Sequence, residues 1–196
     1  MEFKESKTAI NIMRAFAGEG QARNRYDISG KKAARQKLHV IEAVFSFTAK
    51  QELAHAQVFA DMLKGMGGER VTIDADFPTD ADDDILKLLR NAQGNEEEEG
   101  SAVYPAFAAA AREEGFDDIA GRLNMIAEVE KTHSQRFRMF ADLLEQNKLF
   151  VSDVEEEWVC LNCGHSFRGQ AAPEICPVCS HPKGFFIRAF LAPYTE

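Results

Sequence analysis

Cysteine is missing from this 196-residue chain before position 160, and all four cysteines fall between positions 160 and 179. A disulfide framework is therefore excluded for most of the chain, which leaves metal ligation as the competing use of these cysteines. Long apolar runs are missing too, since no stretch approaches ~18 uncharged residues and the first ten residues mix charged with apolar side chains. We therefore expect no signal peptide, no membrane span and a cytoplasmic location.

Basic residues are in deficit, because 23 Lys and Arg stand against 32 Asp and Glu and the formal net charge is −9. This balance repels phosphate backbones and anionic lipid surfaces, so we expect neither nucleic acid nor a membrane as a partner. The hydrophobic fraction of 45% and the charged fraction of 28% are ordinary for a globular protein. The length suits one full domain with a small appendage.

Proline divides the chain into two regions. Residues 1–146 hold only Pro78 and Pro105 and are rich in good helix formers, whereas residues 157–196 hold the other four prolines and all the cysteines. We predict a helical domain over residues 1–146, a linker over residues 147–156 and a compact metal-binding module over residues 157–196.

Apolar side chains recur every three or four residues along four stretches of the helical region, which predicts four amphipathic helices packed as a bundle. The stretches are residues 12–26, 41–62, 86–103 and 119–144. Glu113-Glu114-Gly115 predicts a helix stop between the last two. The turn between the first two is less clearly marked, and the nearest breaker is Gly30, where we expect a kink or an early turn.

Residues 67–80 form a polar connector between the second and third predicted helices. A connector of this length reaches up to ~46 Å when extended, about the length of a helix of ~30 residues, so it can cross the bundle from end to end. Such a crossover gives the ferritin-like topology, whereas a compact loop of the same length would give a simple up-down bundle. We favour the crossover.

Acidic side chains and histidines interrupt all four apolar stripes. The interrupting residues are Glu19, Glu52, His55, Glu96, Glu99, Glu130 and His133. An unpaired buried charge costs at least several kcal/mol, and Arg23 is the one basic residue on these stripes, so two divalent iron or manganese ions are the expected counter-charge. The i, i+3 spacing of Glu52-x-x-His55 and of Glu130-x-x-His133 places each pair on one helix face, as in dimetal carboxylate bundles.

Simpler interpretations remain open for parts of this set. Glu19 could form a salt bridge with Arg23 one turn later, and the acidic run 96–99 could be a solvated face in which only the helical register turns two glutamates inward. Tyr26 and Tyr104 fall beside the predicted ligands, where they could donate hydrogen bonds to them or simply pack.

Cys160-x-x-Cys163 and Cys176-x-x-Cys179 are spaced as two knuckles that hold one tetrahedral ion. Four thiolates suit zinc or a single iron about equally. Taken alone, this pattern favours a structural zinc ribbon over an iron site. Three aromatic residues would supply the small core of the module, and the metal much of its remaining stability. These residues are Trp158, Phe185 and Phe186.

Six segments together resemble the rubrerythrin family over nearly the whole chain. They are FAGEGQARNRY, QELAHAQVF, EEEEGSAVYPAFA and EVEKTHSQRF in the helical region, and WVCLNCGHSF and APEICPVCSHPKGFF in the tail. The resemblance implies a mainly α fold, in which a ferritin-like di-iron four-helix bundle with one long crossover precedes a small rubredoxin-like domain. That domain would hold one iron on its four cysteines, with zinc as a substitute metal.

The resemblance also implies a role for each predicted ligand. Glu52 and Glu130 would bridge the two irons, while Glu19 and Glu96 would be terminal ligands. His133 would bind one of the irons.

By the same resemblance, Glu99 and His55 would exchange at the other iron as its oxidation state changes. The extra inward glutamate at position 99 separates this pattern from ordinary ferritin-like sites. The chain departs from free rubredoxins at Ser180, which stands where they commonly have glycine.

These features predict a cytoplasmic non-haem peroxidase that reduces hydrogen peroxide to water in defence against oxidative stress. A diferrous pair can supply both electrons, and the rubredoxin-like iron would relay electrons to it from an external NAD(P)H-linked reductase or rubredoxin-type donor. The resemblance implies a homodimer or higher homo-oligomer with transfer between subunits. Two alternatives remain open: a ferroxidase or other iron-handling protein, and a bundle with a structural zinc ribbon that binds a protein partner.

Overall fold

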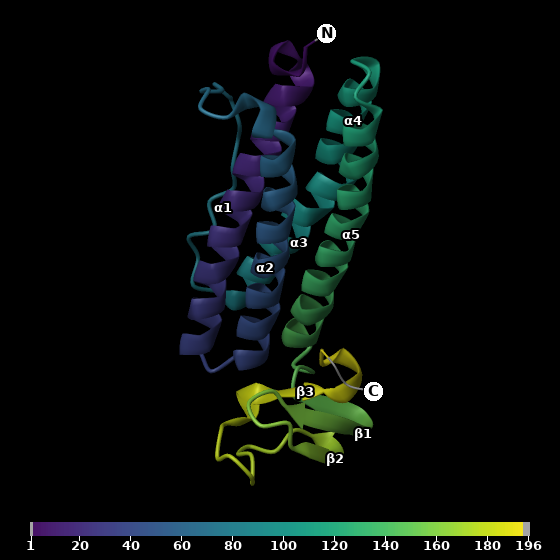
Figure 1. The fold of residues 1–196 in the computed structure, drawn as a ribbon. Coiled ribbons are helices and arrows are strands. Elements are labelled where there is room, and N and C mark those ends of the chain that lie inside the picture. Colours follow the sequence, from purple (N-terminus) through teal and green to yellow (C-terminus); the bar gives the residue numbers. More distant parts are fainter. Residues whose placement is uncertain (1, 194–196) are drawn as a thin grey trace.

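The computed structural model describes residues 2–193 as a long helical bundle followed by a small β-sheet (Figure 1). The helices are α1 (Lys7–Arg35), α2 (His39–Met62), α3 (Ile85–Glu98), a π-helical turn (Glu99–Val103), α4 (Tyr104–Glu113) and α5 (Asp117–Glu145). Short 3₁₀ helices lie at Phe3–Glu5, Lys64–Met66, Lys183–Phe185 and Ala189–Leu191. The strands are β1 (Val151–Cys160), β2 (Ser166–Ala171) and β3 (Phe186–Arg188). Because α3, the π-helical turn and α4 follow one another without a break, they form a single rod.

Two glycines near the predicted turns between the helices differ in what they do. The predicted stop at residues 113–115 is confirmed, since α4 ends there and Gly115 adopts a φ of 86°. The expected kink or early turn at Gly30 is wrong, because α1 continues past it and the turn follows at residues 36–38. Gly30 instead allows close helix packing, since a Cβ there would lie 3.4 Å from the carbonyl oxygen of Glu42 on α2.

The connector between α2 and α3 is the predicted crossover. It has no regular secondary structure over residues 69–84, and it runs alongside α1 (Figure 1). Four polar side chains of α1 and that of Gln36, which caps its C-terminal end, hold it at spacings of seven and four residues. These are Arg14, Gln21, Arg25, Lys32 and Gln36, which contact Asp74, Pro78, Asp80, Asp82 and Asp83 in that order. Because the contacts follow the same order along both segments, the crossover runs parallel to α1.

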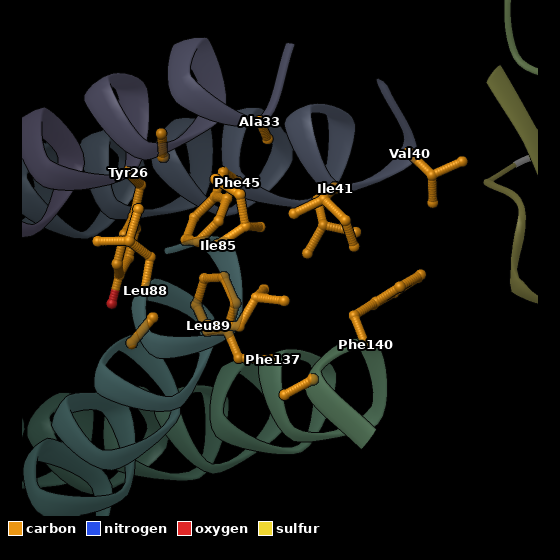
Figure 2. Packing of buried hydrophobic residues seen from close by; sticks show 14 of the residues in the cluster. Tyr26, Ala33, Val40, Ile41, Phe45, Ile85, Leu88, Leu89, Phe137 and Phe140 are labelled. Atoms are coloured by element: carbon orange, nitrogen blue, oxygen red, sulfur yellow. The ribbon is translucent and has the colours of Figure 1, made fainter. Parts of the chain in front are cut away.

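Hydrophobic packing within the bundle forms two separate clusters. The cluster nearer the sheet includes Phe45, Leu89 and Phe137 (Figure 2). The other cluster includes Ile12 and Phe59. On each of the four rods, predicted ligands lie along the chain between residues of one cluster and residues of the other. The bundle therefore contains a polar layer between two apolar ones.

The C-terminal sheet has the strand order β2-β1-β3, and both pairings are antiparallel. Trp158 and Phe186 are buried in its small core, with Phe185 packed against them. Residues 151–156, which we expected in the linker, form the first part of β1. The last three residues of the predicted module, 194–196, lie outside the described residues.

The sheet unit packs against the end of the bundle where α2 begins. The rings of His39 and Phe185 stack with their centroids 3.9 Å apart. Ile187 belongs to the same hydrophobic cluster as Val40 and Ile41 of α2. The C-terminal unit is thus seated on the bundle by apolar and aromatic contacts.

Candidate metal centres

The predicted ligands of the bundle converge on two adjacent points. One group of ligand atoms comes from Glu19, Glu52, His55 and Glu130, and the other from Glu52, Glu96, Glu130 and His133. Within each group, all the ligand atoms lie within 4.8 Å of one another. Because both groups contain Glu52 and Glu130, these two glutamates lie between the two points.

Each histidine faces three carboxylates through its Nδ1 atom. His55 Nδ1 lies 2.9 Å from an oxygen of Glu130, 3.3 Å from one of Glu52 and 3.8 Å from one of Glu19. His133 Nδ1 lies 2.8 Å from the other oxygen of Glu130 and 3.0 Å from the other oxygen of Glu52.

A third carboxylate, that of Glu96, lies 3.2 Å from His133 Nδ1 and completes the second group. Glu19 and His55 both come from the α1–α2 hairpin, while Glu96 and His133 come from α3 and α5. Each half of the bundle therefore supplies the unshared ligands of one point and contributes one glutamate to the shared pair.

Buried polar atoms at these points lack partners among residues 2–193. Both carboxylate oxygens of Glu52 and of Glu130, one oxygen of Glu19 and Nδ1 of His55 make no hydrogen bond of acceptable geometry. Unpaired buried carboxylates would cost several kcal/mol each, whereas two divalent cations would satisfy all of these atoms. Carboxylate and imidazole ligands suit iron, so the residues present fit a pair of iron ions.

Burial and mutual repulsion shift the pKa values of the metal-free site. Burial raises the pKa of Glu19 and of Glu96 well above the usual value, and the charge of Glu52 adds to this effect. Burial acts on Glu52 too, but contacts with the two histidines outweigh it and lower the pKa of Glu52 to about 2. Although burial disfavours charged imidazole, carboxylate contacts raise the pKa of His55 to about 9 and that of His133 to about 11. Protons thus occupy the positions that metal ions would take.

Glu99 lies outside both groups of converging atoms. It is half-buried and begins the π-helical turn, a feature that often marks a functional site in a helix. Burial, followed by the charges of Glu130 and Glu52, raises its pKa to about 8. The next residue, Gly100, packs so close to α5 that a Cβ would lie 2.7 Å from the carbonyl oxygen of Ala127.

Two buried tyrosines hold the unshared glutamates. The hydroxyl of Tyr26 donates to Glu96, and the hydroxyl of Tyr104 donates to Glu19. Both side chains are at most 2% exposed, and burial raises the pKa of each hydroxyl well above its usual value. Each therefore remains a hydrogen-bond donor at neutral pH.

Sequence patterns missed two arginines near the site. Arg25, not the predicted Arg23, is the buried basic residue of α1, and its Nη1 lies 2.6 Å from Oδ2 of Asp80 on the crossover. Arg136 donates to Thr48 at 3.0 Å and to Gln51 at 2.8 Å. Its position three residues after His133 is a signal that could have revealed it. Arg25 had no such local signal, because its partner is far away in the sequence.

The four cysteines also converge. The Sγ atoms of Cys160 and Cys179 are 3.8 Å apart, and those of Cys163 and Cys176 are 3.7 Å apart. Bonds of ~2.3 Å to a tetrahedral ion place sulfurs roughly 3.8 Å apart, so this arrangement fits one metal ion. None of the four forms a disulfide. The pKa of the Cys179 thiol is lowered to about 6, chiefly by a hydrogen bond from the backbone of His181.

Each cysteine pair lies on a tight turn. The amide of Gly164 donates to the carbonyl of Cys160 at 2.8 Å, and the amide of Ser180 donates to the carbonyl of Cys176 at 2.9 Å. Gly164 and Ser180 occupy equivalent left-handed positions, with φ values of 77° and 59°. Ser180 adopts this conformation without the freedom of glycine.

Comparison with known proteins gives the same two-part division. A family model described as rubrerythrin matches residues 11–141, and one described as the rubredoxin-like domain of rubrerythrin matches residues 158–187. Rubrerythrin-1 of Clostridium acetobutylicum is 41% identical over 185 residues, which cover 93% of this chain and 94% of that relative. Rubrerythrin of Nitratidesulfovibrio vulgaris is 39% identical over 183 residues, with 93% and 94% covered.

Solved structures extend the likeness to the fold. Fully reduced, all-ferrous nigerythrin has a TM-score of 0.63 at 26% identity, over 95% of this chain and 91% of that chain. The bacterioferritin of Desulfovibrio desulfuricans, described with its diiron site in different catalytic states, has a TM-score of 0.65 at 20% identity, over 72% and 82%. The second likeness shows the fold alone.

The fold and the two converging ligand sets define a ferritin-like di-iron protein with an appended rubredoxin-like domain. The predicted fold class and cofactor sites are confirmed, namely a di-iron site in the bundle and a rubredoxin-like four-cysteine site in the tail. The chain belongs to the rubrerythrin family, an oxidoreductase family whose members work with redox partners. Within residues 2–193, no helix combines the length and the apolar character needed to cross a bilayer.

Proposed function

We propose that this protein is a peroxidase that reduces hydrogen peroxide to water. The reaction breaks the O–O bond and consumes two electrons and two protons. When bound, the two iron ions supply the two electrons of one turnover. The rubredoxin-like site then returns electrons to the bundle, one at a time, from an external NAD(P)H-linked reductase or rubredoxin-type donor.

The observation that carries this proposal is the pair of adjacent ligand groups that share Glu52 and Glu130. Two metal ions that share ligands can act together on one peroxide molecule, which a single one-electron centre cannot reduce fully. The four-cysteine site on the same chain supports a redox cycle.

Each proposed ligand role corresponds to the residue's membership of one or both groups of converging ligand atoms. We propose that Glu52 and Glu130 would bridge the metal ions, that Glu19 and Glu96 would be terminal ligands, and that His133 would bind the ion nearer Glu96. The tyrosine hydroxyls that donate to the terminal glutamates would hold these carboxylates in place.

We propose that His55 and Glu99 would be alternative ligands of the other ion, one in each of its oxidation states. His55 belongs to a converging group, and Glu99 stands outside it at the edge of the site. This difference supports two alternative ligand positions at one ion. The π-helical turn is the element whose backbone would allow Glu99 to approach.

Electron transfer between subunits of a homodimer is part of the proposal. The C-terminal unit contacts the bundle at His39, and His55 lies sixteen residues further along α2, a rise of about 24 Å. Such a separation within one chain is long for electron transfer, which favours a partner subunit whose cysteine site lies closer. We also propose a cytoplasmic location and a division into a bundle domain, residues 1–146, and a C-terminal domain that contains residues 157–196. Because β1 begins at Val151, the C-terminal domain also takes in residues 151–156 of the expected linker 147–156.

Stopped-flow spectroscopy on the fully reduced protein tests the activity. Stoichiometric hydrogen peroxide is expected to oxidise the iron faster than dioxygen does, with two electrons consumed for each peroxide. Faster oxidation by dioxygen, with continued uptake of added ferrous ion, would instead identify a ferroxidase. Metal analysis of anaerobically purified protein completes the test, because zinc in the four-cysteine site would contradict the electron relay.

A further inference from the structure

A pocket of about 370 Å³ lies between the crossover and the bundle. One wall is α1, the second is formed by residues 74–78 of the crossover, and the third is formed by the end of α3, the π-helical turn and α4. The crossover covers this flank of α1 along its length (Figure 1). The pocket is thus roofed by a segment that polar contacts hold in place at Arg14 and Gln21.

The pocket reaches the side of the di-iron site. Of the seven bundle ligands predicted from the sequence, Glu99 is the one that lines it, and Glu99 is also the most exposed of the seven. The other six are at most 9% exposed. Tyr104 lines the pocket as well, and its hydroxyl donates to Glu19. A small molecule in the pocket would therefore lie next to the ligands of one metal ion.

Most of the surface of the pocket is apolar, although charged side chains, among them Asp74, also line it. Phe77 and Pro78 from the crossover face Val103 and Phe107 from the opposite wall. Asn95 lines the pocket one helical turn before Glu99, and its Nδ2 atom is buried and has no hydrogen-bond partner within residues 2–193. A free donor beside apolar side chains suits a molecule with one polar end and a small apolar part.

The volume exceeds what hydrogen peroxide needs. Since a water molecule occupies ~30 Å³ in the liquid, the pocket has room for several carbon atoms in addition to a peroxide group. Apolar pockets with a few placed polar groups bind ligands of that kind.

We infer that this pocket is a substrate site that admits alkyl hydroperoxides with a small apolar group, as well as hydrogen peroxide. The inference rests on the proposed peroxidase function. The O–O bond breaks, the hydroperoxide accepts two electrons and two protons, and the products are one alcohol and one water. The electrons are the same two that reduce hydrogen peroxide, so no further reductant is required.

Gly18 provides a way to test the pocket without touching a ligand. It lines the pocket from α1, and a Cβ built on it meets no atom within 4 Å. Gly18→Leu therefore fills the pocket, and it favours the helix because leucine is a better helix former than glycine. Gly121 on α5 also lies in open space but does not line the pocket, so Gly121→Leu is the matched control.

The first measurement compares kcat/KM for tert-butyl hydroperoxide and for hydrogen peroxide in the iron-loaded protein with its reductase. We expect wild-type protein to reduce both. Gly18→Leu is expected to lower kcat/KM for tert-butyl hydroperoxide by about tenfold or more while hydrogen peroxide changes by less than about threefold, because added methylene groups exclude the larger substrate. Gly121→Leu is expected to change neither.

The second measurement does not depend on turnover. Crystals soaked in tert-butyl alcohol, the product of that reaction, are expected to show the alcohol between Phe77 and Phe107 in wild type and in Gly121→Leu, but not in Gly18→Leu. Hydrogen peroxide turnover without tert-butyl hydroperoxide turnover would overturn this inference and leave the proposed function standing. So would equal turnover of the larger substrate by Gly18→Leu, or alcohol bound elsewhere only. Failure to reduce either peroxide would overturn both.

Discussion

Four buried glutamates dominate the energetics of the bundle, because each is at most 1% exposed. Their partners in the described chain are two histidines and two tyrosine hydroxyls, which leave several carboxylate oxygens unpaired. The sequence predicted these glutamates because each interrupts an apolar stripe. It could not predict which ones share a metal ion, since that depends on how four rods are placed around one another.

Metal affinity is expected to rise with pH. In metal-free protein, His55 with a pKa of about 9 and Glu99 with a pKa of about 8 hold protons at neutral pH. A metal ion must displace these protons and also the proton on His133, whose pKa is about 11. Binding therefore releases protons and tightens as the pH rises from neutral toward about 11. Calorimetric titration with Mn²⁺ in buffers of different ionisation enthalpy would count the released protons. Affinity that is independent of pH, without proton release, would contradict these pKa shifts.

Tyr104→Phe is expected to destabilise the metal-free protein. It removes the donor to Glu19 in a fully buried setting, and a buried acceptor without its partner costs about 1–3 kcal/mol. Urea denaturation followed by circular dichroism would measure the loss. Ser101→Ala is the control, because it removes an exposed hydroxyl and should change the free energy of unfolding by less than about 0.5 kcal/mol. Equal stability of the two variants would count against a structural role for the tyrosine.

Helices and connecting segments differ in how far the sequence defines them. The sequence at Gly115 predicts where α4 ends and α5 begins, and the length of the connector predicts the crossover. The π-helical turn does not follow from a local signal, and Gly100 within it packs closely against α5, which is a contact between residues far apart in the chain. Gly30 was misleading for the same reason, since close packing against α2 and not a chain break requires glycine there.

Gly100→Ala is expected to disturb the π-helical turn. The added Cβ would overlap the carbonyl oxygen of Ala127, which costs about 1–3 kcal/mol of stability in a packed interior. Gly94→Ala is the control, because it lies in open space on α3 and should gain up to about 1 kcal/mol from helix propensity. Thermal unfolding of both variants compares them. If both were stabilised alike, the close approach at Gly100 would be refuted.

Arg23 and Arg25 of α1 provide another matched pair. Arg25→Met leaves the buried side chain of Asp80 without its cationic partner, although Asn91 still donates a hydrogen bond to it. Breaking a buried ion pair costs about 3–5 kcal/mol. Arg23→Met removes an exposed contact with Asp27 at 4.0 Å and should cost less than about 1 kcal/mol. Denaturant unfolding measures both. A larger loss from Arg23→Met would mean that Arg25 does not anchor the crossover.

Across the complete chain, the C-terminal unit depends on its metal more than the bundle does. Its core consists of few buried side chains around Trp158 and Phe186, whereas the bundle has two extended hydrophobic clusters. The cysteine spacing therefore predicted this module well, because the metal ligands themselves define its turns. Its seating against His39 had no signal in the sequence, since the contact joins residues far apart in the chain.

Replacing the metal of the four-cysteine site with zinc is expected to separate two parts of the activity. Zinc preserves the fold of the module but carries no electrons, so turnover of peroxide with an NAD(P)H-linked reductase should fall to the background rate. A bundle reduced chemically beforehand should still consume one equivalent of peroxide. Steady-state and single-turnover assays on the same preparation test this. Undiminished steady-state turnover would show that the tail is not the electron relay.

The arrangement of ligands has a consequence for the origin of the bundle. Glu19 precedes Glu52 by 33 residues and Glu96 precedes Glu130 by 34, and each second glutamate begins the same Glu-x-x-His sequence. Each helical hairpin thus carries a nearly complete binding site and lacks one glutamate, which the opposite hairpin contributes. Two fused copies of one ancestral hairpin would have this arrangement. An isolated hairpin would have to associate with its own duplicate before it could hold a metal pair.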